Sequence, residues 1–108
     1  MIFEEFNDRV LGISSEIEQY TTNGEILYKT SVNFVALALQ KNNNRIRILL
    51  RTKNNLINDP KNITEIVPKN FDWGNLSHIV YLSPQELNKK YIMEDVLDLV
   101  IQSYKTTQ

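Results

Sequence analysis

Apolar residues recur at steps of three and four residues near both ends of the chain. The first stripe consists of Ile2, Phe3, Phe6, Val10 and Ile13. The second consists of Met93, Val96, Leu97, Val100, Ile101 and Tyr104. This spacing is typical of amphipathic α-helices that bury one side. We therefore expect a helix at each end of the chain. A further helix start is expected at Ser83-Pro84-Gln85-Glu86, which carries N-cap and first-turn residues.

Between the two stripes the period changes from helical to alternating. Short or buried strands are expected over residues 26–28, 32–39, 45–52 and 78–82. In the third of these, alternation turns Ile46, Ile48 and Leu50 to one side and Arg45, Arg47, Leu49 and Arg51 to the other. Asparagines at 42–44 suit a hairpin turn before this strand. Residues 53–70 are expected to form a loop with at most one helical turn.

These elements predict a single α+β domain over residues 1–108. Its antiparallel sheet of about four strands would pack one face against the first and last helices. The predicted core consists of Phe3, Phe6, Phe34, Leu37, Ile48, Leu50, Val80, Val96, Leu97, Val100 and Ile101.

Composition excludes several classes of protein and site. The chain has 108 residues, of which 42% are hydrophobic, enough for one core. It contains no cysteine, so disulfides, zinc–thiolate sites and a cysteine nucleophile are excluded. The acidic N-terminal segment differs from a signal peptide, and no apolar run approaches the ~18 residues of a membrane span. We expect a cytoplasmic protein with no membrane contact.

Charge is distributed unevenly along the chain. Residues 1–25 carry six acids and one base, whereas residues 26–58 carry six bases and no acid. Within this basic third, Arg45, Arg47 and Arg51 share one side of a strand. Neighbouring positions on that side are about 6.6–7 Å apart, close to the spacing of nucleic-acid phosphates. The candidate nucleic-acid-binding residues are therefore Lys41, Arg45, Arg47, Arg51 and Lys53.

Two other interpretations of this arginine-rich strand stay open. The arginines could form a solvated sheet face paired with acids of the first helix, in exposed pairs worth about 0–1 kcal/mol each. They could also contact a protein partner. The sequence leaves open which interpretation holds, and it leaves the oligomeric state open too.

Candidates for catalysis and for cofactor binding are few. His78 is the only histidine, and no Ser, Asp or Glu stands at a spacing that marks a catalytic triad. A histidine at a strand edge or on the surface is the simpler interpretation. Trp73 could stack on a base or anchor a loop to the core. The carboxylates show no metal-ligand spacing, and the three glycines are too far apart for a phosphate loop. We expect no metal and no cofactor.

The order of several short motifs resembles a known domain. These motifs are Leu27-Tyr28-Lys29, Asn33-Phe34-Val35, Arg47-Ile48-Leu49-Leu50, Asp59-Pro60, Trp73-Gly74-Asn75, Ile79-Val80-Tyr81-Leu82 and Gln102-Ser103-Tyr104. Together they resemble the uncharacterised C-terminal domain of proteins labelled "predicted transport protein", which also follows nuclease domains and occurs in Gmr-type restriction-associated proteins. Asp72 stands where that family usually has a histidine before Trp-Gly. A fainter likeness is to the MmcQ/YjbR-like family.

Because the sequence shows no assembled nucleophile, base or metal constellation, we expect that the chain by itself is not an enzyme. The resemblance implies an accessory domain of a larger nuclease, restriction or regulatory system. We expect such a module to contact a nucleic-acid backbone through the arginine-rich strand. The alternative is a protein–protein interaction or dimerisation domain without nucleic-acid binding.

Overall fold

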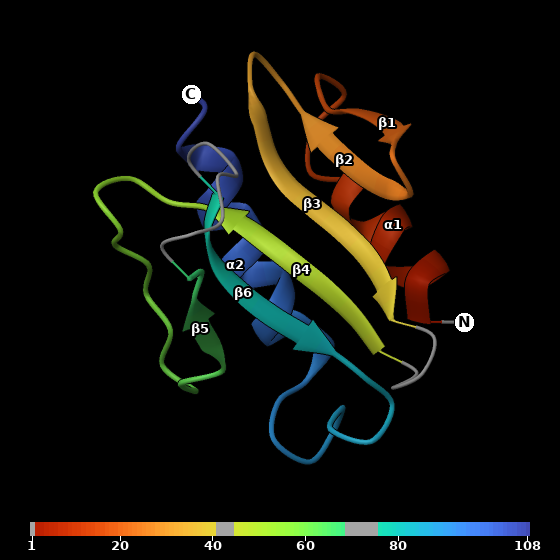
Figure 1. Cartoon of the computed structure of the whole chain (residues 1–108), viewed down its shortest axis with the longest axis vertical. Coiled ribbons are helices and arrows are strands. Elements are labelled where there is room, and N and C mark those ends of the chain that lie inside the picture. The colour runs from red at the N-terminus through yellow and green to blue at the C-terminus, as the bar shows by residue number, and fades with distance from the viewer. Residues whose placement is uncertain (1, 41–44, 69–75) are drawn as a thin grey trace.

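The computed structural model of the chain describes residues 2–40, 45–68 and 76–108. Over these residues it contains two helices and six strands (Figure 1). In chain order they are α1 Ile2–Leu11, β1 Glu18–Thr22, β2 Glu25–Lys29, β3 Asn33–Gln40, β4 Arg45–Arg51, β5 Thr64–Ile66, β6 Leu76–Leu82 and α2 Met93–Lys105. The α+β class is as predicted, and so are the helix before the first strand and the helix after the last strand.

All six strands form one antiparallel sheet in the order β1-β2-β3-β4-β6-β5. Both helices lie on the same side of this sheet, behind β2, β3, β4 and β6 in the view of Figure 1. We call the side that carries Ile46, Ile48 and Leu50 the helix face. The opposite side, which carries Arg45 and Arg47, is called the second face.

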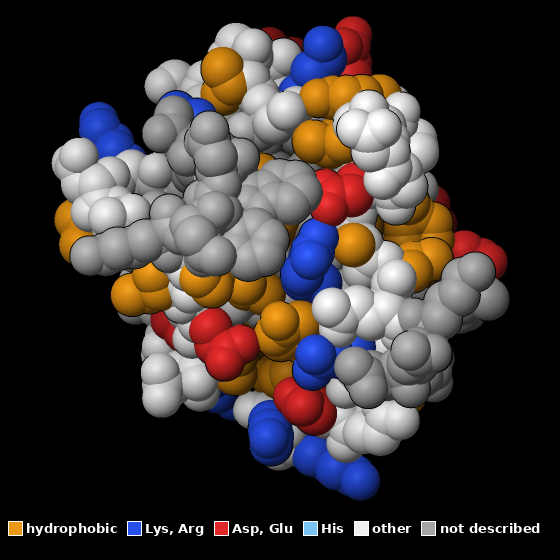
Figure 2. All heavy atoms as spheres, viewed as in Figure 1, with side chains coloured by type: hydrophobic (Ala, Val, Ile, Leu, Met, Phe, Trp, Pro, Cys, Tyr) orange, Lys and Arg blue, Asp and Glu red, His pale blue; other side chains and the backbone are white. Residues whose placement is uncertain are grey.

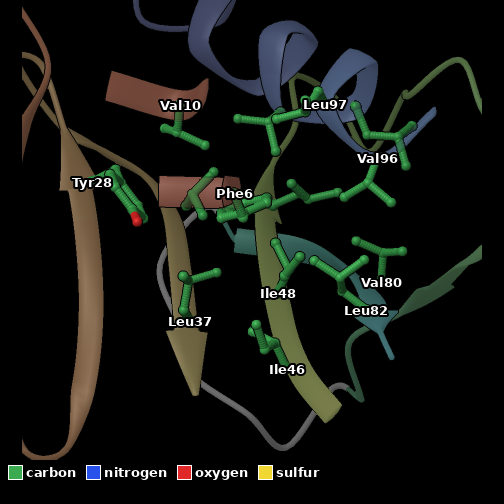
Figure 3. Close-up of a cluster of buried hydrophobic side chains, with 14 of the residues drawn as sticks. Phe6, Val10, Tyr28, Leu37, Ile46, Ile48, Val80, Leu82, Val96 and Leu97 are labelled. Atoms are coloured by element: carbon green, nitrogen blue, oxygen red, sulfur yellow. The ribbon is translucent and has the colours of Figure 1, made fainter. Parts of the chain in front are cut away.

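The main core lies between the two helices and the helix face (Figure 3). Phe6 and Val10 of α1 and Val96 of α2 point toward Ile48 of β4, and all four residues have no exposed surface. Burying side chains of this size contributes roughly 1.5–3 kcal/mol each. The sequence-predicted core is confirmed, except that Phe3 and Ile101 are only partly buried.

A smaller cluster forms on the second face. Leu27, Ala36, Leu49 and Leu76 are at most 7% exposed and lie on four different strands. Val67, which follows β5, and Ile79 of β6 pack against them. The second face is therefore apolar and buried around Leu49 and polar around Arg45 and Arg47.

The prediction of about four strands is wrong, because β1 and β5 were not foreseen. The five residues of β1 are all exposed, so they show no alternation of apolar and polar positions. They are held by a two-residue turn at Asn23-Gly24, whose backbone φ angles of 50° and 79° suit asparagine and glycine. Strand β5 is three residues long, too short to show any period. It pairs with β6 inside the segment expected to be a loop.

The expected helix start at Ser83 is also wrong. Residues 84–90 form successive turns, and Asn88 has a left-handed φ of 68°. Ser83 is buried, and its backbone N–H donates to the hydroxyl of Tyr91, which in turn donates to the carbonyl of Tyr81. Helix α2 instead begins at Met93, where the Asp95 carboxylate accepts a hydrogen bond from the Ile92 N–H at 2.8 Å. Tertiary contacts at the end of β6 override the local capping signal.

This packing predicts that two leucines differ sharply in how much they contribute to the free energy of unfolding. Replacing Leu50, which is fully buried, with alanine should lower the free energy of unfolding by about 2–5 kcal/mol through cavity formation. Leu56→Ala is the matched control, because Leu56 is 73% exposed and its loss should change stability by less than about 0.5 kcal/mol. Urea unfolding curves measure both. Equal losses for the two variants would contradict the assigned core.

Candidate functional site

The arginine-rich strand β4 is one of the two central strands of the sheet, and its neighbours decide what the arginines can do. Strand β4 pairs with β3 on one side and with β6 on the other. Arg45 lies opposite Gln40, and Arg47 lies between Ala38 and Tyr81. Leu49 of the same strand belongs to the apolar cluster of the second face. The predicted division of β4 into an apolar side and an arginine-bearing side is therefore confirmed.

Arg47 is paired with an acid inside the fold. Its guanidinium Nη2 lies 2.7 Å from Glu25 Oε1, and the two side chains are 23% and 15% exposed. Glu25 comes from β2, two strands away from β4. Continuing the β2–β3 register places Glu25 opposite Ala38, which itself pairs with Arg47. The small Ala38 side chain lets the two long side chains meet above β3.

The acid that neutralises Arg47 therefore lies in a strand, whereas the acids of the first helix lie on the other side of the sheet. Arg9 of α1 pairs at 3.8 Å with Glu94 of α2, so this ion pair also lies on the helix side of the sheet. Arg47 does have a compensating acid, but the expectation that the first helix supplies it is wrong, because Glu25 belongs to β2.

Arg45 has a different environment. Its guanidinium carbon lies 3.9 Å from the centre of the Tyr81 ring, a cation–π contact. Its Nε donates a hydrogen bond to Gln40 Oε1. These two contacts hold the guanidinium in one place while leaving Arg45 half-exposed. A positioned, half-exposed guanidinium is well suited to receive an anionic group of a partner.

An open groove of about 710 Å³ lies beside this Arg45–Tyr81 pair. We call it the Arg45 groove. Its lining combines three cations, two carboxylates, one aromatic ring and two further side chains: Arg45, Lys61, Lys90, Glu65, Glu86, Tyr81, Asn62 and Ile63. Figure 2 shows the second face, where basic and acidic side chains lie next to one another with hydrophobic side chains between them. The surface has mixed charge and not a continuous positive charge.

The other predicted binding residues do not extend this surface. Arg51 is half-buried and lies opposite Leu76 across an irregularity in the β4–β6 pairing. Lys53 is exposed beyond the end of β4, at a bridge to Leu56. Lys41 and Trp73 fall outside the described residues. The structure thus brings Arg45 and Arg47 together on one face and places Lys53 past the far end of the strand.

Sequence reasoning missed most of the groove. Lys61 precedes β5, Glu65 lies in β5, and Lys90 follows β6. These residues line one groove only because β5 pairs with β6, and a three-residue strand leaves no periodic signal in the sequence. The side of β6 on which Tyr81 lies could be predicted, because alternation along the strand turns Tyr81 to the opposite side from Val80 and Leu82. Placing it beside Arg45 requires the register between β4 and β6.

The loop that carries Lys61 and Asn62 is held by Asp59. Its carboxylate accepts hydrogen bonds from the backbone N–H groups of Ile63 and Thr64 and from the Thr64 hydroxyl, at 2.7–3.0 Å. Burial by itself would raise the pKa of Asp59, but these hydrogen bonds together lower it. Asp59 is therefore a charged structural residue that shapes one wall of the groove.

His78 lies on the helix face and is 6% exposed, so the expectation of a surface or edge histidine is wrong. The reason is β5, whose Ile66 pairs with His78 and makes β6 an inner strand. The His78 Nδ1 lies 2.9 Å from the Ser77 hydroxyl, which also bonds the Thr52 hydroxyl. Burial lowers the pKa of His78, and the negative charge of Asp59 opposes that effect. Among the described residues no hydrogen bond joins His78 to a carboxylate.

Comparison of the chain with protein-family models, with curated proteins and with solved structures finds no match. Among the described residues, no group of three or more His, Asp or Glu side chains could hold a metal ion. Neither helix in the described ranges is long and apolar enough to cross a membrane.

The Arg47–Glu25 pair should be important for stability. Glu25→Gln removes the carboxylate charge that lies 2.7 Å from the half-buried guanidinium of Arg47, so we expect a loss of about 1–3 kcal/mol in the free energy of unfolding. Glu18→Gln is the matched control. Its pair with Lys29 is 3.9 Å long and mostly exposed, and its loss should cost less than about 1 kcal/mol. If chemical denaturation shows the same small effect for both, the Arg47–Glu25 pair does not neutralise the face as described.

His78 should make stability depend on pH in one direction. Its folded-state pKa is lowered from the ordinary 6.5, so the unfolded chain takes up the proton first as pH falls. The stabilisation from the neutral ring is complete above the unfolded pKa and is lost as pH falls from it toward the folded pKa. His78→Asn keeps a hydrogen-bonding group but should remove this part of the pH dependence.

Thermal unfolding of both proteins between about pH 7.5 and about pH 5 isolates the effect, because the carboxylates are common to both. The difference in stability between native protein and variant should shrink as pH falls through this range. A difference that stays constant would contradict the lowered pKa.

Proposed function

We propose that this chain is a non-catalytic recognition module that binds a protein partner through the Arg45 groove and the adjoining second face. The observation that carries the proposal is that Arg45 and Arg47 both contact other side chains of the same chain. Arg47 is paired with Glu25 at 2.7 Å, and Arg45 is stacked on Tyr81. A face whose cations are already compensated or positioned recognises a complementary pattern of charges better than it attracts a polyanion.

The composition of the groove supports a protein as the partner. Tyrosine and arginine are the residue types most enriched at the energetic centres of protein–protein interfaces. Glu65 and Glu86 line the same groove as Lys61 and Lys90. Carboxylates repel a phosphate backbone, whereas a peptide can offer both signs of charge to a mixed surface.

Contact with a nucleic-acid backbone is the competing hypothesis from the sequence, and it stays a prediction. Within the part of the chain that the structure describes, Arg45, Arg51 and Lys53 take part in no ion pair. Arg51 is half-buried beside Leu76, which leaves Arg45 and Lys53 as the candidates for phosphate contact. They stand at opposite ends of β4. Two phosphate contacts would give a salt dependence of only about −1.8 in the log–log slope on duplex DNA.

A non-catalytic role is likewise a proposal. Three side chains that could act as base or nucleophile, His78, Ser77 and Thr52, are joined by hydrogen bonds, and His78 is buried. Asp59 is occupied by three hydrogen bonds from its own loop. These groups have structural partners that account for their positions. The resemblance to restriction-associated accessory domains agrees with this proposal.

The proposal is tested by selecting a phage-displayed library of random peptides on the immobilised protein. Enriched peptides should carry both acidic and basic residues, and Arg45→Gln should weaken their binding at least about tenfold, the loss of one charge-assisted contact. Lys53→Gln is the matched control, because it removes an exposed cation away from the groove and should leave affinity unchanged. Fluorescence anisotropy gives the dissociation constants.

The same protein is titrated with a labelled DNA duplex at about 50 mM and about 200 mM salt. We expect no saturable binding. A log–log slope of about −2.7 or steeper, corresponding to three phosphate contacts, would overturn the protein-partner proposal if Arg45→Gln and Arg47→Gln flatten it. That result would establish the nucleic-acid hypothesis in its place.

A further inference from the structure

Strand β1 forms one edge of the sheet, far from the Arg45 groove. It pairs with β2 on its inner side, and within the described ranges no strand pairs with its outer side (Figure 1). All five of its residues are exposed. A strand in this position presents unpaired backbone N–H and C=O groups that can pair with another strand.

The hairpin between β1 and β2 determines which backbone groups are free. Thr22 and Glu25 flank the two-residue turn, where positive φ angles at Asn23 and Gly24 correspond to a type I′ turn. The pair flanking such a turn is hydrogen-bonded, and antiparallel pairs alternate between bonded and non-bonded. Residues 18, 20 and 22 therefore bond inward to β2. The N–H and C=O groups of Gln19 and Thr21 point outward.

This edge has only one of the features that usually block pairing, the charged Glu18 at its first position. Strand β1 contains no proline and no lysine, and its register with β2 is uninterrupted. The opposite edge is different: β5 has three residues with Glu65 at its centre, and Pro68 follows soon after. The protection of one edge and the openness of the other point to β1 as a pairing surface.

We propose that two copies of this chain associate through their β1 strands, antiparallel and centred on Tyr20. In this register Gln19 of one copy faces Thr21 of the second copy, and the reverse pair repeats the contact. The four outward N–H and C=O groups of each copy then form four backbone hydrogen bonds across a two-fold axis. The two sheets become one continuous twelve-stranded sheet, twice the six strands of one copy.

The side chains of β1 are complementary to themselves in this register. Glu18 faces Thr22 of the second copy, so no two like charges stand opposite each other. The two Tyr20 residues face each other as a non-hydrogen-bonded pair, whose Cα atoms approach to about 4.5 Å. Within one copy, Tyr20 is already held by a 2.7 Å hydrogen bond from its hydroxyl to Asn33 Oδ1 and by Lys29 Nζ, 5.4 Å from the ring centre. A pre-positioned aromatic ring loses little freedom on pairing.

A second copy is the occupant that this geometry favours. An unrelated extended segment would need outward groups at the matching spacing and an uncharged or basic residue opposite Glu18. The identical strand satisfies both conditions by symmetry. The dimer leaves the Arg45 groove free, because β1 and β5 lie at opposite ends of the strand order.

Cysteine cross-linking tests the register directly, since the chain contains no cysteine. Tyr20→Cys places two thiols across the two-fold axis, in a pair close enough for a disulfide. Leu56→Cys is the matched control, because Leu56 is exposed and lies away from β1. Under oxidised glutathione, the Tyr20→Cys protein should form disulfide dimers at least about tenfold faster than the control. Equal rates would overturn the proposal.

Sedimentation equilibrium tests the same contact without a cross-link. The native protein and Thr21→Ala should show a concentration-dependent dimer, because both keep the outward N–H of residue 21. Thr21→Pro removes that donor without removing a β1–β2 hydrogen bond, and it should be monomeric. A monomeric native protein, or a Thr21→Pro dimer of unchanged strength, would contradict β1 pairing. If Thr21→Pro does not fold, as judged by circular dichroism, the cross-linking rates decide.

These outcomes are separate from the proposed function. Loss of peptide binding in Arg45→Gln leaves the β1 contact untouched, and loss of dimerisation in Thr21→Pro leaves the groove intact. A native protein that dimerises but selects no peptide would support the β1 inference and contradict the protein-partner proposal.

Discussion

The structure depends on the burial of one side of β4 against the two helices, which leaves the opposite side to carry the arginines. Its apolar side, Ile46, Ile48 and Leu50, is at most 5% exposed and packs against α1 and α2 together with β3 and β6. Since successive residues of a strand point to opposite sides, this packing necessarily turns Arg45 and Arg47 to the second face. A shift of one residue in register would bury the arginines and expose the isoleucines, at a large cost in free energy. The hydrophobic core therefore sets the position of the polar surface.

The second face shows how a basic sequence segment can yield a surface of mixed charge. Residues 26–58 contain no acid, yet Arg47 has an acidic partner, because β2 brings Glu25 alongside. The pair spans β3 above Ala38, where a larger side chain would keep the two groups apart. The charge that a partner meets depends on this three-strand arrangement and not on the local composition of one strand. Segments around β5 and after β6 then complete the Arg45 groove.

Much of the fold could be predicted from the sequence, because amphipathic stripes and alternating strands reflect burial directly. The stripes of α1 and α2 and the alternation in β4 are of this kind. Strand β1 could not be predicted from such a pattern, because all of its residues are exposed. The Asn23-Gly24 turn that precedes β2 is nevertheless a hairpin signal. Ser83 shows the opposite failure, where a strong local signal is overridden by tertiary contacts. The Arg47–Glu25 pair joins residues 22 positions apart, and finding it required the register of three strands.

The register of β4 determines which side of the sheet carries the arginines, and cross-strand nuclear Overhauser effects measure it directly. In this account, backbone protons of Arg47 lie opposite those of Ala38 on one side and of Tyr81 on the other. Cross-peaks linking Arg47 to both residues are the predicted result. Cross-peaks linking Arg47 to Leu37 and Val80 instead would mean a register shifted by one residue, with the arginines turned toward the helices, and would contradict the account.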